Sequence, residues 1–183
     1  MKKLFRIIIL ILVIIGIIKA VPAVFDSFFP ETYKRQVEDT AEKYNVDKNL
    51  VFAIIKAESN FNKDAVSKKG ANGLMQVMDE TGQWCAKEIG EAEVDLSDVS
   101  CNINLGTFYF SYLLQKYNGN EKCAIAAYNA GHGNVDKWLS DTEFSADGKN
   151  LDKIPFDETD KYVKKVMFYK KIYSYKDKNA ANN

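Results

Sequence analysis

The sequence predicts a mainly α-helical fold, organised as one domain over residues 31–175 behind a hydrophobic N-terminal segment. Beyond residue 30, apolar residues recur at helical spacing, and polar loops punctuated by glycine separate these stretches. No stretch alternates apolar and polar residues as a half-buried strand would. With 183 residues, 46% hydrophobic and 27% charged, the chain is long enough to bury one sizeable core.

Residues 1–25 differ in kind from the rest of the chain. Two lysines and Arg6 precede an apolar run over residues 7–18, which could be the core of a secretory signal with a weak cleavage site at 21–23. Alternatively, the 22 residues at 4–25 are long enough to span a bilayer core of about 30 Å. Because the cleavage site is weak, we favour an uncleaved membrane anchor, followed by a short linker at 26–30.

The charges around this segment predict its orientation. Basic residues at the extreme N-terminus keep that end in the cytoplasm. We therefore expect the rest of the chain to be extracytoplasmic, anchored to the outer face of the cytoplasmic membrane. Cleavage of the segment would instead release a secreted protein.

The composition of the body excludes several classes of function. Beyond residue 30 there are 21 basic and 24 acidic residues, so no basic field for nucleic acid is expected. His132, the one histidine, has no neighbours at metal-ligand spacing, and no nucleotide motif occurs, so we expect neither metal nor cofactor. We favour free thiols at Cys85, Cys101 and Cys123 over a disulfide between the first two, and we expect a monomer.

The first half of the body predicts two helices and a loop. Pro30 is expected to open a helix that continues to Tyr44. Asp47 is a suitable N-cap for the next helix, which carries Glu58. Residues 60–73 are polar and glycine-punctuated, which predicts a long loop.

The second half predicts four helices, at 79–90, 100–119, 120–131 and 158–175. Asp79 is the expected cap of the first of them. The last is amphipathic, and its inward face is expected to comprise Val163, Val166, Met167, Tyr169 and Tyr173. Residues 176–183 are expected to form a disordered tail.

One carboxylate lies where an amphipathic helix should carry none. In "NLVFAIIKAESNF", residues 49–61, the apolar side chains gather on one broad face at about 100° per residue, and Glu58 falls inside that face. Lys56 lies on the other side. A carboxylate in this position usually has a structural explanation, either an ion pair or a place at the edge of the face.

The segments that accompany Glu58 favour a functional explanation. Ser59 follows it, and the loop beyond leads to residues 73–76, which offer close backbone approach, apolar side chains and an amide. Tyr128 stands at a helix end broken by Gly131 and Gly133. A half-buried acid with these groups around it predicts a cleft for a polar polymer with apolar faces, such as a sugar chain.

Four motifs resemble, in the same order, those of the soluble lytic transglycosylase family: "AIIKAESNFNKDAVSKKGANGLMQVM", "NINLGTFYFSYLLQKY", "AIAAYNAGHGNV" and "IPFDETDKYV". The resemblance covers about residues 31–175 and implies a lysozyme-like catalytic domain. It also implies cleavage of peptidoglycan strands at the β-1,4 bond between N-acetylmuramic acid and N-acetylglucosamine. Members of the family use no water: the muramyl 6-hydroxyl closes onto C1 and leaves a 1,6-anhydro ring.

The resemblance implies roles for individual residues. Glu58 becomes the sole catalytic acid and base, with Ser59 holding its carboxyl group. Tyr162 would also belong to the packing face of the last helix, so a structural role stays open for it. Asp79 stands where many members have proline, and this difference affects only the start of the helix predicted at 79–90. The residues expected to line the sugar sites are Gly73, Leu74, Met75, Gln76, Tyr128, Asn129, Glu158 and Tyr162, together with Ser59.

A single acid is chemically sufficient for this reaction. Apolar surroundings would raise the pKa of Glu58, so that it stays protonated and can act as a general acid. Ordinary glycosidases use two carboxylates about 5–9.5 Å apart, but Asp64, Asp79 and Glu80 are better explained as turn formers and caps. One acid suffices if the acetamido group of the substrate stabilises C1.

Two alternatives remain open at this stage. A goose-type lysozyme would share the architecture and would hydrolyse the strand instead. A non-catalytic glycan-binding module of a cell-wall or secretion assembly would have lost cleavage. The second alternative is weaker, because a binding site has no need of a buried, unpaired acid.

Overall fold

The computed structural model describes residues 24–181 and four earlier positions, Arg6, Ile11, Ile14 and Gly16. The chain divides into two compact units, Met1–Thr32 and Tyr33–Asn183. In the first unit, residues 24–28 are helical, and the ring centroids of Phe25 and Phe29 lie 5.3 Å apart. The linker predicted at 26–30 therefore begins within helical residues.

The membrane anchor predicted at residues 4–25 lies largely outside the described residues. Among the residues that are described, no helix combines the length and the apolar character needed to cross a bilayer.

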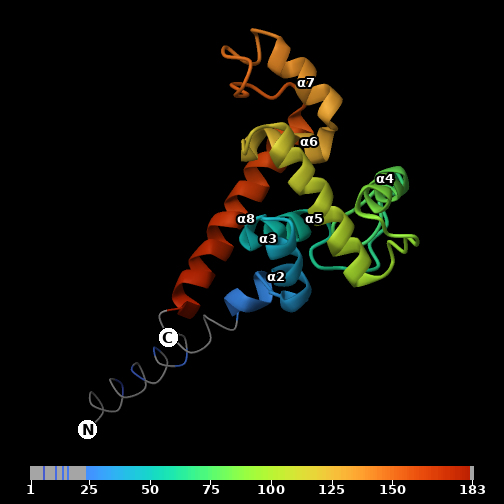
Figure 1. Cartoon of the computed structure of the whole chain (residues 1–183). Coiled ribbons are helices and arrows are strands. Elements are labelled where there is room, and N and C mark those ends of the chain that lie inside the picture. Colours follow the sequence, from blue (N-terminus) through green and yellow to red (C-terminus); the bar gives the residue numbers. More distant parts are fainter. Residues whose placement is uncertain (1–5, 7–10, 12–13, 15, 17–23, 182–183) are drawn as a thin grey trace. The chain divides into compact units, whose positions relative to one another are not determined.

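The second unit is helical, as predicted (Figure 1). Its helices are α2 (Lys34–Lys43), α3 (Lys48–Glu58), α4 (Asp79–Ile89), α5 (Val99–Lys116), α6 (Glu121–Ala130), α7 (His132–Ser140) and α8 (Asp157–Ala181). Extended pairing within the described residues is limited to isolated bridges in the loop between α3 and α4, where Asn72 pairs with Val66 and with Val77.

Helix α3 forms the centre of the core. All six residues at 50–55 are buried, so α3 is apolar on nearly every side and is surrounded by other elements. Helix α8 runs along it, as Figure 1 shows. The ring of Phe52 stacks on the fully buried ring of Tyr173 with centroids 5.3 Å apart.

Ion pairs tie α8 to the start of α3 and to the start of α6. Lys48 Nζ lies 2.8 Å from Asp177 Oδ1. Lys170 Nζ lies 2.6 Å from Glu121 Oε1 and 3.3 Å from Asp47 Oδ2. Residues 176–181 belong to the last turns of α8, and Asp177 makes one of these pairs. The prediction of a disordered tail is therefore wrong for residues 176–181.

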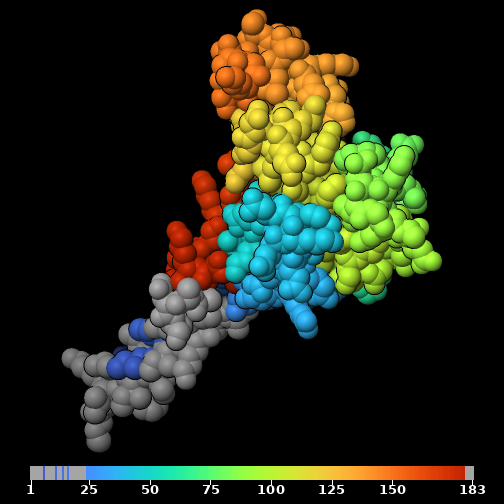
Figure 2. Space-filling model, viewed as in Figure 1, coloured from blue at the N-terminus to red at the C-terminus, as the bar shows by residue number. Residues whose placement is uncertain are grey.

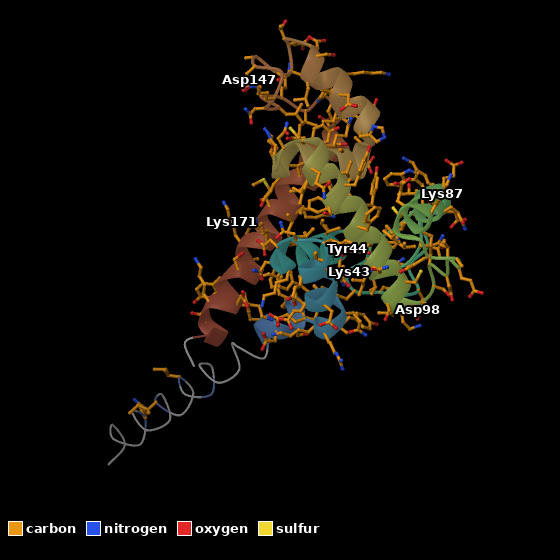
Figure 3. The ribbon with its side chains drawn as sticks, viewed as in Figure 1. Lys43, Tyr44, Lys87, Asp98, Asp147 and Lys171 are labelled. Atoms are coloured by element: carbon orange, nitrogen blue, oxygen red, sulfur yellow. The ribbon has the colours of Figure 1, made fainter. Side chains whose placement is uncertain are left out.

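Several predicted helix boundaries are confirmed. Asp47 caps α3 by accepting a hydrogen bond from the backbone N–H of Asn49 at 2.9 Å. Helix α5 begins one residue before its predicted start, and its cap, which the sequence did not single out, is Asp98 (labelled in Figure 3), which accepts from the N–H of Cys101 at 2.8 Å. Gly90 ends α4 in the left-handed conformation that glycine adopts readily, with φ of 75°.

Other boundaries differ from the prediction. Helix α2 begins at Lys34 and not at Pro30, because Tyr33 adopts a left-handed conformation with φ of 63°. Asp79 is the first residue of α4 and not its cap, which is Met78. Its Oδ1 instead accepts a hydrogen bond from Asn72 Nδ2 at 3.2 Å, which holds the preceding loop.

Helix α7 was not predicted, because Gly131 and Gly133 indicated a break in the chain. Gly131 does take up the turn, with φ of 83°, but Gly133 lies inside the new helix. Figure 2 shows the segment of α7, in orange, and the segment of α4, in green, as separate projections from the body of this unit. The three cysteines are free, as favoured from the sequence.

Candidate active site

Glu58 is the last residue of α3, and its side chain is half-buried. The phenol of Tyr162, on α8, donates a hydrogen bond of 2.6 Å to Glu58 Oε1. Burial raises the pKa of Glu58 above its usual range, although the hydrogen bond from Tyr162 and the positive charge of Lys165 partly oppose that shift. The position at the C-terminal end of a helix disfavours the charged form as well.

Tyr162 and Lys165 form the wall of α8 that faces the acid. Lys165 Nζ donates to the carbonyl oxygen of Ala57 at 2.9 Å and lies 5.6 Å from the ring centroid of Tyr162. Burial, followed by the charge of Glu58, raises the pKa of the Tyr162 phenol, so it remains a donor. Tyr162 therefore combines the two roles left open by the sequence: it is buried in the packing face and it holds the acid.

The resemblance implied that Ser59 holds the carboxyl group of Glu58, but the structure gives Ser59 another partner. Its Oγ donates to the carbonyl oxygen of Ile55 at 3.2 Å, one turn back along α3. A hydroxyl that follows the last turn of a helix is close to these unsatisfied carbonyls and commonly bonds to one of them. The structure gives the contact with Glu58 to Tyr162 instead.

The loop at residues 73–76 is fastened to α5 by Asn102, a residue that the sequence did not single out. Asn102 is buried; its Oδ1 accepts from Met75 N at 2.8 Å, and its Nδ2 donates to the carbonyls of Asn72 and Leu96 at 2.9 and 3.0 Å. A Cβ on Gly73 would lie 2.2 Å from Asn102 Nδ2, so only glycine fits there. One signal was available: an asparagine inside the apolar helix at 100–119 needs partners if it is buried.

Leu74 and Met75 are fully buried, so their side chains belong to the core and anchor this loop. Met75 fits against α5 because position 106 is glycine, where a Cβ would lie 2.7 Å from Met75 Sδ. The amide of Gln76 braces the same loop, since its Nε2 donates to the carbonyls of Ala65 and Gly73, both at 2.9 Å. Direct contact of these side chains with a sugar stays a prediction.

Tyr128 and Asn129 lie at the end of α6. Tyr128 Oη donates to the carbonyl oxygen of Met75 at 2.9 Å, and burial followed by the charge of Glu58 raises the pKa of this phenol. Tyr128 is thus within the electrostatic reach of the acid. Asn129 Oδ1 accepts from Thr159 Oγ1 at 2.7 Å, which joins α6 to the first turn of α8. Glu158 is exposed in that same turn, four residues before Tyr162.

The acids weighed as second carboxylates have other surroundings. Asp64 is exposed and pairs with Lys63 at 2.7 Å, Asp79 accepts from Asn72, and Glu80 is exposed in the first turn of α4. The described part of the chain also contains no group of three histidine, cysteine or acidic side chains able to hold a metal ion. The chemistry available at Glu58 is therefore that of one carboxyl group with a raised pKa and two protonated phenols nearby.

Comparisons with known proteins agree with this geometry. A model of the family described as the transglycosylase SLT domain matches residues 35–151. The soluble lytic murein transglycosylase of Escherichia coli is 34% identical over 152 residues, which are 80% of this chain and 24% of that protein. Its counterpart in Salmonella typhimurium is 34% identical over 150 residues, 79% of this chain and 23% of that one.

Solved structures give the same result for the fold. An inactive glutamate-to-glutamine mutant of lytic transglycosylase Slt from Pseudomonas aeruginosa has a TM-score of 0.74 and 36% identity, over 82% of this chain and 25% of that chain. The 70 kDa soluble lytic transglycosylase of Escherichia coli has the same TM-score and coverage at 31% identity, and a complex of the 70 kDa enzyme with bulgecin A matches equally well.

The chain spans about a quarter of the length of these relatives. The resemblance deduced from the four motifs and the fold that it implied are both confirmed. This chain belongs to the transglycosylase SLT domain family.

Proposed function

We propose that this protein is a peptidoglycan lytic transglycosylase, which cleaves the β-1,4 bond between N-acetylmuramic acid and N-acetylglucosamine and forms a 1,6-anhydromuramyl product. The observation that carries the proposal is Glu58, a half-buried carboxyl group with a raised pKa and one tyrosine donor. Membership of the family and the names of the relatives support the same reaction.

The reaction needs two proton transfers, and Glu58 performs both. Protonated Glu58 gives its proton to the glycosidic oxygen as the bond from that oxygen to C1 breaks. The acetamido group of the substrate stabilises C1. The carboxylate then takes the proton of the muramyl 6-hydroxyl as its oxygen bonds to C1, so the acid is restored and no water is consumed.

The surrounding residues position the acid and the strand. Tyr162 fixes the orientation of the carboxyl group and stabilises the carboxylate that forms between the two transfers. Leu74 and Met75 anchor the loop from within the core, and Gly73, Gln76, Tyr128 and Asn129 are the proposed sugar contacts. Ser59, next to the acid, and Glu158, exposed in the first turn of α8, are also proposed to contact the strand.

We also propose an extracytoplasmic location, with residues 4–25 as the anchor in the cytoplasmic membrane. The long apolar run and its basic N-terminal flank support this placement. Cell fractionation and sequencing of the mature N-terminus test it. A soluble product that begins near Val24 would contradict the anchor and indicate secretion.

The reaction itself is tested by the mass of its products. The full chain, purified in mild detergent, is incubated with peptidoglycan, and the released muropeptides are weighed. Because the 6-hydroxyl is held beside C1, its effective concentration greatly exceeds that of a loosely held water. The expected products are therefore one water lighter than hydrolytic fragments, and they lack a new reducing end.

The same experiment decides between the alternatives. Reducing-end products would identify a lysozyme and contradict the single-acid mechanism. Absence of any product, with glycan retained by the protein in a pull-down, would identify a binding module.

A further inference from the structure

The outer face of α8 carries lysines and aromatic rings that are exposed. Successive residues of a helix are offset by about 100°, which brings six side chains beyond the first turn of α8 onto one face about 100° wide. Phe168 is 57% exposed and Tyr175 is 65% exposed. The four lysines among them are exposed as well. This basic face comprises Lys161, Lys164, Phe168, Lys171, Tyr175 and Lys178.

The opposite side of α8 belongs to the core. Val166 and Tyr173 are fully buried there, and Tyr162 reaches Glu58 from that side. Lys165 lies outside the basic face, because its Nζ bonds to the carbonyl of Ala57. Lys171, labelled in Figure 3, points away from the rest of the unit. The basic face is therefore directed away from both the core and the acid.

The positive charge of the body is concentrated on this helix. Residues 161–178 contain seven lysines and one acid, Asp177, which pairs with Lys48. The remainder of the chain beyond residue 30 has 14 basic and 23 acidic residues. The acids nearest to the face lie in the first turn, where Asp160 Oδ2 pairs with Lys164 Nζ at 2.6 Å. A field of one sign on an otherwise acidic body attracts an anionic partner.

The exposed rings favour a bilayer over a soluble polyanion as that partner. Charges alone suffice to bind a soluble polyanion, whereas Phe168 and Tyr175 add apolar surface two turns apart among the lysines. At a membrane surface, aromatic rings settle at the level of the headgroups, and lysine stems lie along apolar surface with their charges in water. The face is about 25 Å long, long enough for α8 to lie along the interface.

We propose that the basic face of α8 binds the surface of an anionic phospholipid bilayer. The helix lies in the plane of the interface, its lysines bind lipid phosphates, and the rings of Phe168 and Tyr175 enter the headgroup region. Because Tyr162 lies on the opposite side of α8, the bilayer leaves Glu58 uncovered. The proposal depends neither on the reaction proposed above nor on residues 4–25 being an anchor.

The test compares two kinds of vesicle that differ in charge. The full chain is reconstituted into vesicles of phosphatidylcholine alone, or of equal parts phosphatidylcholine and phosphatidylglycerol. An uncharged acetylating reagent labels the lysines briefly, and mass spectrometry measures the rate at each one. Residues 4–25 are present in both samples, so a difference confined to the basic face reports that face.

Lys161, Lys164 and Lys171 should react at least about threefold more slowly in the anionic vesicles. Lys87, exposed on α4 (Figure 3), should react equally in both. Salt at about 1 M should remove the difference, because the Debye length falls to about 3 Å. Equal rates at the basic face in the two vesicles would overturn the proposal.

A second measurement separates a bilayer from a soluble polyanion. Trp84 and Trp138 are the two tryptophans of the chain. With both replaced by phenylalanine and Phe168→Trp added, all tryptophan emission comes from position 168. Anionic vesicles that contain lipids brominated near the headgroup should quench this emission, and uncharged vesicles with the same label should not. Slow acetylation that soluble poly(glycerol phosphate) produces as strongly as vesicles, without quenching, would overturn the bilayer in favour of a soluble polyanion.

Charge reversal supplies the matched variants. Lys164→Glu with Lys171→Glu should abolish both the slow acetylation of Lys161 and the quenching, while release of muropeptides in detergent stays unchanged. Lys87→Glu with Lys137→Glu changes the net charge equally at exposed positions elsewhere and should keep both effects. An equal loss in the two double variants would contradict a role for this face. Since the acetylation experiment uses the unsubstituted chain, it decides even if a variant fails to fold.

Discussion

Two carboxyl groups in this protein each accept a hydrogen bond from a tyrosine, yet their pKa values are shifted in opposite directions. At the candidate active site, Tyr162 donates to Glu58 at 2.6 Å; where α5 meets α7, Tyr117 donates to Asp136 at 2.9 Å. The pKa of Glu58 is raised, because burial outweighs its favourable contacts. The pKa of Asp136 is lowered: burial opposes this, but Lys116 Nζ, 2.9 Å from Asp136 Oδ2, and the bond from Tyr117 together outweigh it.

The difference shows what separates the proposed catalytic acid from a structural one. Asp136 is 44% exposed and has a cation in direct contact, so it is ionised and joins two helices. Lys165, the cation whose charge acts on Glu58, donates its hydrogen bond to the carbonyl of Ala57 and not to the carboxyl group. One tyrosine donor is not enough to offset the loss of water around the carboxyl group. The same bond therefore accompanies a carboxyl group with a raised pKa in one place and one with a lowered pKa in the other.

The largest effect is expected from removing each carboxyl group in turn. Glu58→Gln keeps the volume but cannot transfer a proton, so release of anhydro-muropeptides should fall by about 10²–10⁴-fold. Asp136→Asn, the matched control, should keep activity within about twofold, because this acid takes no part in the reaction. Both are measured on purified peptidoglycan. Activity above a few per cent in Glu58→Gln, or an equal loss in Asp136→Asn, would remove the distinction between the two pairs.

A smaller effect is expected from removing each tyrosine hydroxyl. Tyr162→Phe deletes a donor that lowers the pKa of Glu58, so that pKa should rise further. Since the general acid must be protonated, the alkaline limb of the pH dependence of kcat/KM should move to higher pH, with a loss of about tenfold in kcat. Tyr117→Phe should leave the profile in place. A shift to lower pH in Tyr162→Phe would contradict the role assigned to this bond.

The smallest effect concerns stability, and its sign should differ between the two acids. A raised pKa means that folded protein holds more protons than unfolded protein, so the contribution of Glu58 to stability falls as pH rises. Glu58→Gln should therefore be more stable than wild type at pH 7, by about 1.4 kcal/mol for each unit of the upward shift. This gain should vanish below the unfolded pKa of about 4.3.

Asp136→Asn should show the reverse dependence. A lowered pKa stabilises the folded protein above the unfolded value of about 3.9, and this contribution is lost as pH falls through the folded pKa. The variant should be less stable at pH 7 by under about 1 kcal/mol, because the group is exposed, and equal to wild type in strong acid. Urea unfolding at several pH values measures both variants. If both variants changed the free energy of unfolding at pH 7 in the same direction, the assigned pKa directions would be contradicted.

Prediction from sequence succeeded where the signal is local. Glu58 was found because its place on an apolar face can be read from neighbours within two turns, and Asp47 was found because a cap acts within its own first turn. Helix α7 was missed because the pattern Gly-X-Gly at 131–133 is as typical of a break as of the tight turn that actually joins two helices.

Prediction failed where the partner is distant in the chain. The family resemblance implied that Ser59 holds the carboxyl group of Glu58, whereas the donor in the structure is Tyr162, 104 residues further on. Asn102 passed unnoticed for the same reason, since two of its partners belong to a loop about 30 residues earlier. Helical periodicity shows which residues turn inward, but only the packing of α8 and α5 shows what each of them meets.

The position of α8 has a consequence for the timing of activity. The ribosome makes this helix after all the others described here, and it supplies both the donor to Glu58 and the cover for α3. A chain that stops before residue 157 would lack the cover that α8 gives to α3, including the ring of Tyr173 stacked on Phe52, and exposed apolar surface of this kind makes unfinished chains prone to aggregation. Its acid would also lack Tyr162. A protein proposed to open the cell wall would thus complete its proposed acid–base site only after the last helix has been made.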